Sequence, residues 1–271
     1  MLPHSVQLTP NQTPLLADFW RDFDSENPPF IHAADRAVID ARKERDYRFD
    51  SLEAFVNSSV FGAPGRGLHL HLLPMPFAGD LANADIFILL LNPGFETADY
   101  VAGGLGSTLR TACADTIRQR VSDFAFPFIF LDPQFCWSGG YRWWEGKLRG
   151  VLAEFARLRC ISYFKALKAM SRRIAVLEYF PYSSNSGPEG LRELPSSTAA
   201  RAYVHEVVLP RARKGELTLV VTRQANAWGI TSEYDNGRNI IVYGGGETRA
   251  AHLSTGSRGG QAILNCLLVD V

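Results

Sequence analysis

The segment Asp85-Ile86-Phe87-Ile88-Leu89-Leu90-Leu91-Asn92-Pro93-Gly94-Phe95 decides the fold that this sequence predicts. Six consecutive apolar residues, Ile86 to Leu91, show no alternation with polar ones. Such a run is typical of a parallel strand that is buried on both faces. The run ends at a turn signal, Asn92-Pro93-Gly94. Because open α/β sheets bind ligands just past the carboxyl ends of their strands, Asn92 is a candidate for chemistry as well as a residue that starts a turn.

Three more short apolar runs predict buried strands, at residues 174–180, 217–222 and 239–243. The spacing of apolar residues between and after these runs predicts helices at 107–121, 148–173, 196–213 and 260–268. Ser196 or Ser197 is the expected N-cap of the third helix. Strands that alternate with helices imply a parallel sheet with right-handed crossovers. The sequence therefore predicts an α/β fold.

Residues 1–73 differ from the rest of the chain in being polar and mostly helical in pattern. Helical spacing occurs at residues 15–20, 34–45 and 50–56, and Asp50 or Ser51 is the expected N-cap of the last. The proline-rich segment 74–80 is expected to be extended and to lead into the first strand. We therefore expect a helical N-terminal extension, residues 1–73, packed on an α/β domain that spans residues 74–271.

The composition is that of a globular protein with a substantial core. The chain has 271 residues, of which 46% are hydrophobic, and a formal net charge of zero. A neutral chain neither indicates nor excludes nucleic acid as a partner. No apolar run approaches the ~18 residues that a membrane-spanning helix needs. Residues 1–20 hold no Lys or Arg, so no signal peptide is predicted.

No metal or cofactor site is predicted. The chain has four dispersed cysteines: Cys113, Cys136, Cys160 and Cys266. They form no C-x-x-C pair, which argues against a zinc site or an iron–sulfur cluster and suits a reducing cytoplasm. His69 and His71 alternate as on one strand face, but no third ligand is near, and a catalytic metal normally needs three protein ligands. We therefore expect a cytoplasmic protein without a metal or cofactor.

Two features near the middle of the chain suit nucleic-acid binding. Residues 132–144 place five aromatic side chains among turn residues: Phe135, Trp137, Tyr141, Trp143 and Trp144. Such aromatic residues either anchor a loop to the core or offer stacking faces to a base. Residues 141–173 hold nine Lys or Arg against two acids. This excess is either a solvated helix face or a track for phosphates.

Polar motifs follow three of the predicted strands. They are Asn92-Pro93-Gly94-Phe95, Pro181-Tyr182-Ser183-Ser184-Asn185, and His252-Leu253-Ser254-Thr255-Gly256-Ser257. The first resembles the first motif of the uracil-DNA glycosylase superfamily, which its mismatch-specific and single-strand-selective branches write as Asn-Pro-Gly after an apolar run. The third is similar to the second motif of that superfamily, His-Pro-Ser-x-x-Ser, and has Leu253 in place of Pro. The resemblance covers residues 74–268.

The resemblance implies a three-layer α/β/α fold with a central four-stranded parallel sheet, and DNA crossing the carboxyl edge of that sheet. It implies a monofunctional DNA glycosylase, a hydrolase that flips a deaminated or modified base into a pocket and cleaves its N-glycosidic bond. Asn92 would hold the attacking water. His252 would donate a hydrogen bond to a pyrimidine carbonyl as negative charge builds there.

The resemblance also implies a set of substrate contacts. Phe95, or one of Phe135 and Trp137, would stack on the flipped base. Ser254 and Ser257 would bind phosphates, and Arg258 or Leu253 would push into the base stack. At the end of the second strand, relatives have an Asn that reads the base edge, whereas this chain has Phe180-Pro181-Tyr182. The expected substrate-binding residues are Gly94, Phe95, Phe135, Trp137, Tyr182, Ser183, Asn185, Ser254, Ser257 and Arg258.

A second class of function stays open, a non-catalytic protein of the same fold that binds nucleic acid or a nucleotide. The neutral net charge, Leu253 and the missing Asn on the second strand favour it. A different class of enzyme is not indicated, because the chain has no G-x-S-x-G, no P-loop and no H-E-x-x-H motif.

Overall fold

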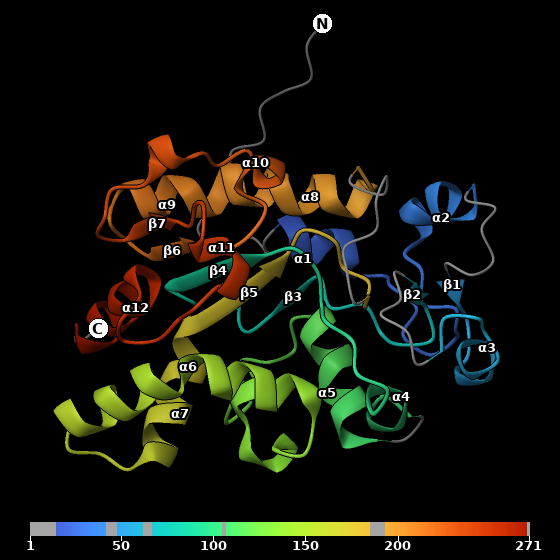
Figure 1. Cartoon of the computed structure of the whole chain (residues 1–271), viewed down its shortest axis with the longest axis horizontal. Coiled ribbons are helices and arrows are strands. Elements are labelled where there is room, and N and C mark those ends of the chain that lie inside the picture. The colour runs from blue at the N-terminus through green and yellow to red at the C-terminus, as the bar shows by residue number, and fades with distance from the viewer. Residues whose placement is uncertain (1–14, 42–47, 62–66, 105–106, 185–192, 270–271) are drawn as a thin grey trace, which may run out of the picture.

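The computed structural model describes residues 15–41, 48–61, 67–104, 107–184 and 193–269. Its main sheet has five strands in the order β3-β5-β4-β6-β7 (Figure 1). The four predicted strands are present and parallel to one another, as β4 (Ile86–Leu90), β5 (Ile174–Glu178), β6 (Thr218–Val221) and β7 (Ile240–Val242). The predicted α/β class is therefore confirmed.

The sheet is mixed rather than purely parallel, so the expected four-stranded sheet is wrong in this respect. The fifth strand, β3 (Phe77–Ala78), runs antiparallel to β5 at the edge of the sheet. The sequence did not reveal this strand, because it pairs through only two residues and follows Pro74 and Pro76, and proline is confined to edge strands. Gly79 ends β3 with φ +92°, and a Cβ there would lie 2.3 Å from the Ile174 carbonyl oxygen, so only glycine fits this close approach.

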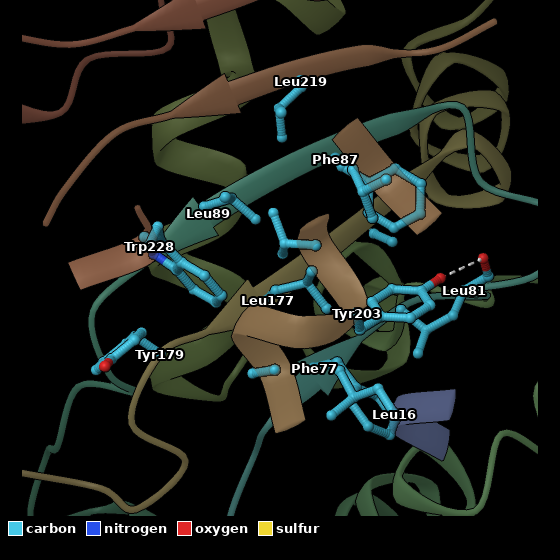
Figure 2. Packing of buried hydrophobic residues seen from close by; sticks show 14 of the residues in the cluster. Leu16, Phe77, Leu81, Phe87, Leu89, Leu177, Tyr179, Tyr203, Leu219 and Trp228 are labelled. Carbon is cyan, nitrogen blue, oxygen red and sulfur yellow. Dashed lines mark hydrogen bonds between the residues drawn. The ribbon is translucent and has the colours of Figure 1, made fainter. Parts of the chain in front are cut away.

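Both faces of the sheet are buried, as the unbroken apolar run of β4 predicts. Phe87 and Leu89 enter one core, which also holds Leu177 and Leu219 (Figure 2). The residues that alternate with them, Ile86, Ile88 and Leu90, enter a second core on the opposite face. The sheet is thus the middle layer between two sets of helices.

The helices of the first face are α1 (Leu15–Trp20), α8 (Pro195–Tyr203), a π-helical turn (Val204–Val208) and α9 (Leu209–Arg213). Those of the second face are α6 (Gly139–Leu158), α7 (Tyr163–Arg173) and α12 (Arg258–Leu268). Figure 1 shows α8 and α9 on one side of the sheet and α6 and α7 on the other. Helix α5 (Thr108–Ile117) packs beside β3. Three one-turn helices lie in connections: α4 (Asp99–Ala102), α10 (Ala225–Trp228) and α11 (Glu247–Ala250).

Serine side chains begin most of the longer helices. The hydroxyls of Ser107, Ser138, Ser162 and Ser257 accept hydrogen bonds from backbone N–H groups in the first turns of α5, α6, α7 and α12. Such caps satisfy N–H groups that have no partner within the helix. The predicted cap at Ser196 or Ser197 is wrong: α8 begins after Leu194 with Pro195 in its first turn, where proline loses no hydrogen bond.

Helix α6 begins at Gly139, earlier than the sequence pattern predicts. Trp143 and Trp144 therefore lie on a helix rather than in a loop. Of this pair, Trp144 is buried in the second core and Trp143 is 40% exposed. The two glycines at 139 and 140 concealed the helix start, since glycine lowers helix propensity.

The described part of the N-terminal region packs on the domain core. Leu16 and Trp20 of α1 are fully buried in the first core, and α2 (Ala33–Asp40) contacts α8. The region is not purely helical, because β1 (Arg48–Phe49) pairs in parallel with β2 (Leu68–His69) beside α3 (Leu52–Val56). The hydroxyl of Ser51 caps α3, as predicted. Within the described ranges, none of the helices combines the length and the apolar character that crossing a membrane requires.

Candidate functional site

A cavity of about 330 Å³ lies at the carboxyl end of β4 and β5. Its walls include the segment from Leu91 to Glu96, the last residue of β5, the first turns of α5 and α6, and Arg223 beyond β6. This is the edge at which open α/β sheets bind ligands, and the volume falls within the range of about 300–1,000 Å³ for small-molecule sites. The position agrees with the one expected for Asn92.

Asn92 is held in one orientation at this cavity. Its Nδ2 donates hydrogen bonds to the carbonyl oxygens of Pro93 at 2.8 Å and Ser184 at 2.9 Å, and to the Ser184 hydroxyl at 3.1 Å. A flipped amide would place Oδ1 against two carbonyl oxygens, so these contacts fix which atom is the nitrogen. Oδ1 is therefore the amide atom that remains for a water or a ligand.

Phe95 presents a supported aromatic ring to the same cavity. One of its faces stacks on His69, with ring centroids 3.4 Å apart and planes inclined by 10°. The Nδ1 of His69 lies 2.9 Å from the Tyr100 hydroxyl, and burial lowers the pKa of His69 to about 4. The imidazole is therefore neutral at pH 7. His69 and Phe95 thus form a rigid, uncharged stack at the cavity wall.

Another part of the cavity lining comes from α6 and the segment before it. Trp143 and Phe130 line the cavity, and Gly140 permits the approach of Phe130, since a Cβ there would lie 2.5 Å from that ring. Gly94 also lines the cavity, and a Cβ at this position would meet open space. The cavity lining therefore includes aromatic side chains from separate segments, which suits a planar ligand.

Two residues of the cavity, Glu178 and Arg223, were missed by the sequence analysis. Glu178 is 8% exposed and its Oε2 has no hydrogen-bond partner among the described residues; the same is true of the buried Nε of Arg223. Burial raises the pKa of Glu178 well above its usual value, although the Arg223 guanidinium opposes this rise. Glu178 could have been found from the sequence, because it is the one charged residue in the apolar run Ile-Ala-Val-Leu-Glu. No sequence motif marks Arg223.

Cys113 also lines the cavity, but its chemistry is not that of a nucleophile. Burial raises the pKa of its thiol to about 12, so the reactive thiolate does not form near neutral pH. All four cysteines are free thiols. In the part of the chain that the structure describes, no cluster of three or more His, Cys, Asp or Glu side chains is placed to hold a metal ion.

His252 is exposed and is not among the described residues that line the cavity. Its backbone carbonyl accepts a hydrogen bond from the Tyr243 hydroxyl. The segment before it is tied to α6, because Lys147 Nζ donates to the carbonyl oxygen of Ala250 and lies 5.4 Å from the Trp143 ring centroid. The motif around His252 therefore borders the aromatic wall, while the imidazole itself lies outside the cavity lining.

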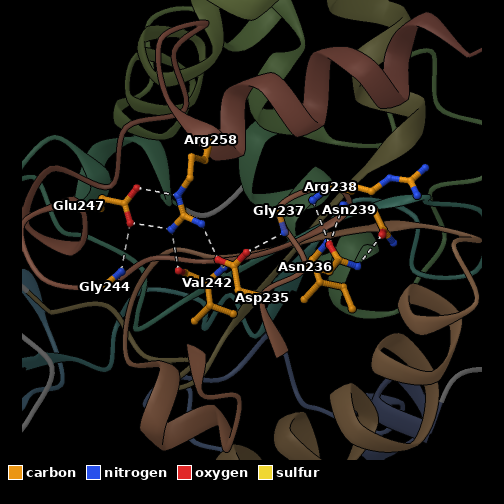
Figure 3. Close-up of polar contacts among 10 residues, drawn as sticks. Asp235, Asn236, Gly237, Arg238, Asn239, Val242, Gly244, Glu247 and Arg258 are labelled. Carbon is orange, nitrogen blue, oxygen red and sulfur yellow. Dashed lines mark hydrogen bonds and ion pairs between the residues drawn. The ribbon is translucent and has the colours of Figure 1, made fainter. Parts of the chain in front are cut away.

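The other residues of that motif have structural partners. The Ser257 hydroxyl caps α12 and donates to the Ser254 carbonyl oxygen at 2.8 Å, while the Ser254 side chain is exposed. The Arg258 guanidinium forms ion pairs with Asp235 at 2.5 Å and Glu247 at 2.8 Å (Figure 3). The role expected for Arg258 as a wedge in a base stack does not agree with this position, because two carboxylates already hold its guanidinium.

The remaining predicted contacts divide between core and surface. Phe135 is 2% exposed in a small core with Leu109 and Ile129, so it does not reach the cavity. Trp137 is 50% exposed, and its Nε1 donates to the Gln134 carbonyl oxygen outside the cavity lining.

On the segment after β5, Tyr182 is buried and its hydroxyl donates to Asp35 at 2.7 Å, which is a structural contact. Ser183 does line the cavity. Asn185 lies outside the described residues. The structure therefore brings together Asn92, Gly94, Phe95 and Ser183 of the predicted set.

The basic segment 141–173 does not lie beside the cavity along its whole length. Arg142, Arg149 and Arg157 pair with glutamates. Arg172 lies in the last turn of α7, directly before β5 begins, and so at the edge of the sheet opposite the cavity. The last charges of the segment therefore lie away from the cavity, at the end of the sheet where β5 begins.

Comparison of the chain with protein-family models, with curated proteins and with solved structures finds no match. The site is thus interpreted from its own geometry.

Proposed function

We propose that this protein is a monofunctional DNA glycosylase that hydrolyses the N-glycosidic bond of a deaminated or modified base flipped out of DNA. The observation that carries the proposal is the fixed Asn92 amide in the lining of a cavity that also holds aromatic side chains. Its Nδ2 is tied to Pro93 and Ser184, which leaves Oδ1 to hold a water.

The amide suits a dissociative hydrolysis. The bond between C1′ and the base nitrogen breaks, the base leaves with the electron pair, and water adds to C1′ and loses a proton to solvent. A carbonyl oxygen positions this water without deprotonating it, which is enough when C1′ is oxocarbenium-like and needs only a weak nucleophile. The reaction would be slower than one that uses a carboxylate at the same place.

The aromatic walls offset the cost of extruding the base. Unstacking a nucleotide costs a few kcal/mol, and enzymes that flip bases regain it through stacking inside the pocket. Phe95 is well suited because His69 supports its other face and keeps the ring from turning. A base that stacks on Phe95 from the cavity would extend this pair of rings by one.

A non-catalytic nucleic-acid- or nucleotide-binding protein is the second candidate. One observation favours it: the His252 imidazole is exposed and does not line the cavity. In that case the cavity would bind a base without the donor that assists its departure.

Incision of a panel of modified oligonucleotides tests the proposal. Single- and double-stranded DNA with one uracil, hypoxanthine or xanthine would be treated with the protein and then with alkali. We expect cleavage of at least one substrate, and a rate roughly 10²-fold lower for Asn92→Ala, because the water loses its position. Asn226→Ala, on the exposed surface of α10, is the matched control. Binding without cleavage across the whole panel would favour the non-catalytic alternative.

A further inference from the structure

The cavity lining contains two buried polar atoms that none of the described residues satisfies. They are Oε2 of Glu178 and Nε of Arg223, and neither has a hydrogen-bond partner among the residues that the structure describes. Buried polar groups are almost always paired, because an unpaired one destabilises the fold. Two such atoms in the wall of one cavity therefore indicate that their partners are supplied by a ligand.

The two side chains flank Asn92. Glu178 is the last residue of β5 and Arg223 follows β6 by two positions, while Asn92 follows β4 by two positions. Because β4 lies between β5 and β6 in the sheet, the three side chains come from the carboxyl ends of three adjacent strands. A ligand in the cavity would meet an acid on one side, a guanidinium on the other and the Asn92 amide between them.

The acid is suited to bind as a neutral group. The Glu178 side chain is more than nine-tenths buried. Burial raises the pKa of its carboxyl group more than the Arg223 guanidinium lowers it. A protonated carboxyl has one O–H donor beside one acceptor. It therefore matches a ligand edge that presents an acceptor next to a donor.

We propose that Glu178 and Arg223 together read the edge of a planar oxo heterocycle, namely the lactam edge of a deaminated purine or pyrimidine base. The Glu178 hydroxyl donates to a ring carbonyl, and its carbonyl oxygen accepts from the neighbouring ring N–H. The Nε–H of Arg223 donates to a further acceptor of the ring. This inference rests on the proposed function, since the ligand is the base that the enzyme would release.

Positive charge beside the cavity favours an oxo base over an amino base. A neutral acid alone pairs with the edge of either kind. Burial and the nearby Arg223 cation lower the pKa of Lys147, so a second cation lies near Arg223. A departing oxo base carries negative charge on its carbonyl oxygens, which preorganised cations stabilise. Amino bases lack one of these oxygens.

Binding of free bases tests this inference apart from catalysis. Uracil, hypoxanthine and xanthine would be compared with cytosine and adenine by saturation-transfer NMR on the full chain. We expect the oxo bases to bind at least tenfold more tightly. Glu178→Gln, which keeps a donor beside an acceptor, should bind within about threefold of the wild type, whereas Glu178→Ala and Arg223→Gln should lose tenfold or more. Circular dichroism melts of each variant establish that it is folded.

The dependence of base binding on pH distinguishes a Glu178 that contacts the ligand from a Glu178 that only stabilises the fold. The other titratable side chains that line the cavity are Glu96, Asp99, Arg110, Cys113 and Arg223. Wild-type binding should fall as Glu178 ionises at high pH, and the fall should be smaller in Glu178→Gln. The ionisation of the ligand and of these other groups is common to both proteins, so the difference between the two profiles belongs to Glu178.

Each outcome decides between the two proposals. Binding of oxo bases with the expected variant order, but no incision, would uphold the inference and overturn the glycosylase proposal. Incision that Glu178→Ala and Arg223→Gln leave unchanged would overturn the inference and uphold the glycosylase. Equal binding of oxo and amino bases, or a folded Glu178→Ala that binds as tightly as the wild type, would also overturn the inference.

Discussion

Asn92 and Ser184, on the segments that follow two neighbouring strands, are joined by two hydrogen bonds through one nitrogen atom. Nδ2 of Asn92 donates to the backbone carbonyl of Ser184 at 2.9 Å and to its hydroxyl at 3.1 Å. The same strand ends are joined by a backbone hydrogen bond from Phe180 to the Leu91 carbonyl oxygen at 2.8 Å. The side chain with the proposed chemical role is therefore also a tie between β4 and β5.

This double role predicts that Asn92→Asp is more destabilising than Asn92→Ala at pH 7. The aspartate would place a charged oxygen against the carbonyl oxygens of Pro93 and Ser184, where the wild type has a donor. We expect a loss of about 1–3 kcal/mol in the free energy of unfolding, the range for a polar group left facing another acceptor. Urea denaturation at pH 7 measures it.

Acid provides the control for this prediction. Below the pKa of the introduced carboxyl, a protonated aspartate regains one donor, so the difference between the two variants should shrink. An Asn92→Asp protein that is as stable as the wild type at pH 7 would show that the amide orientation is not fixed by these carbonyl groups.

Substitution of Phe95 tests the proposed stacking wall. Phe95→Ala should weaken binding of DNA that carries a modified base by the equivalent of about 1–3 kcal/mol, the usual contribution of one base–aromatic stack. Phe61→Ala is the matched control, because Phe61 is exposed and packs on Phe55 away from the cavity. Fluorescence anisotropy with modified and unmodified oligonucleotides measures the effect. An equal loss for both oligonucleotides would exclude stacking on a flipped base.

The buried His69 predicts a specific dependence of stability on pH. Its pKa is lowered to about 4 in the folded protein, whereas an unfolded histidine titrates near 6.5. Between these values the unfolded chain binds more protons than the folded one, so stability is present above about pH 6.5 and is lost as the pH falls towards 4.

His69→Gln should flatten this part of the stability profile. Glutamine does not titrate, and its amide can still meet the Tyr100 hydroxyl that His69 contacts. His71→Gln, two residues further on, is the control that should keep the wild-type slope. Melting temperatures measured from pH 4 to pH 7 provide the comparison, and identical slopes for His69→Gln and the wild type would contradict the assignment.

The sequence was most informative where burial imposes a pattern. The unbroken apolar run from Ile86 to Leu91 predicted a strand covered on both faces. The run is unbroken because Phe87 and Leu89 enter one core while Ile88 enters the core on the opposite face. It also placed Asn92 at the carboxyl edge. β3 was not predicted, because a strand of two residues after a proline shows no periodic pattern.

The site was only partly predictable, because side chains from distant segments create it. Ser183 was expected from its place after β5, but Arg223 follows β6 in a sequence that has no motif. Conversely, Phe135 and Tyr182 have the residue types of a binding site and are buried in packing contacts. Composition cannot distinguish an aromatic that stabilises a core from one that lines a cavity.

The position of Arg172 predicts which charges contribute to DNA binding. The helix α7 ends where β5 begins, so Arg172 lies at the amino edge of the sheet, whereas the cavity lies at the carboxyl edge. If DNA crosses the cavity, Arg172→Ala should leave the slope of log affinity against log salt unchanged.

Arg142 provides the contrast, because it pairs at 2.6 Å with Glu96 of the cavity wall. Arg142→Ala removes one cation and leaves the Glu96 carboxylate without this partner. The substitution should therefore weaken DNA binding and reduce the salt slope by about one. Affinities at several salt concentrations measure both slopes. A slope that falls for Arg172→Ala and not for Arg142→Ala would place the DNA on the opposite edge of the sheet and remove the cavity from its path.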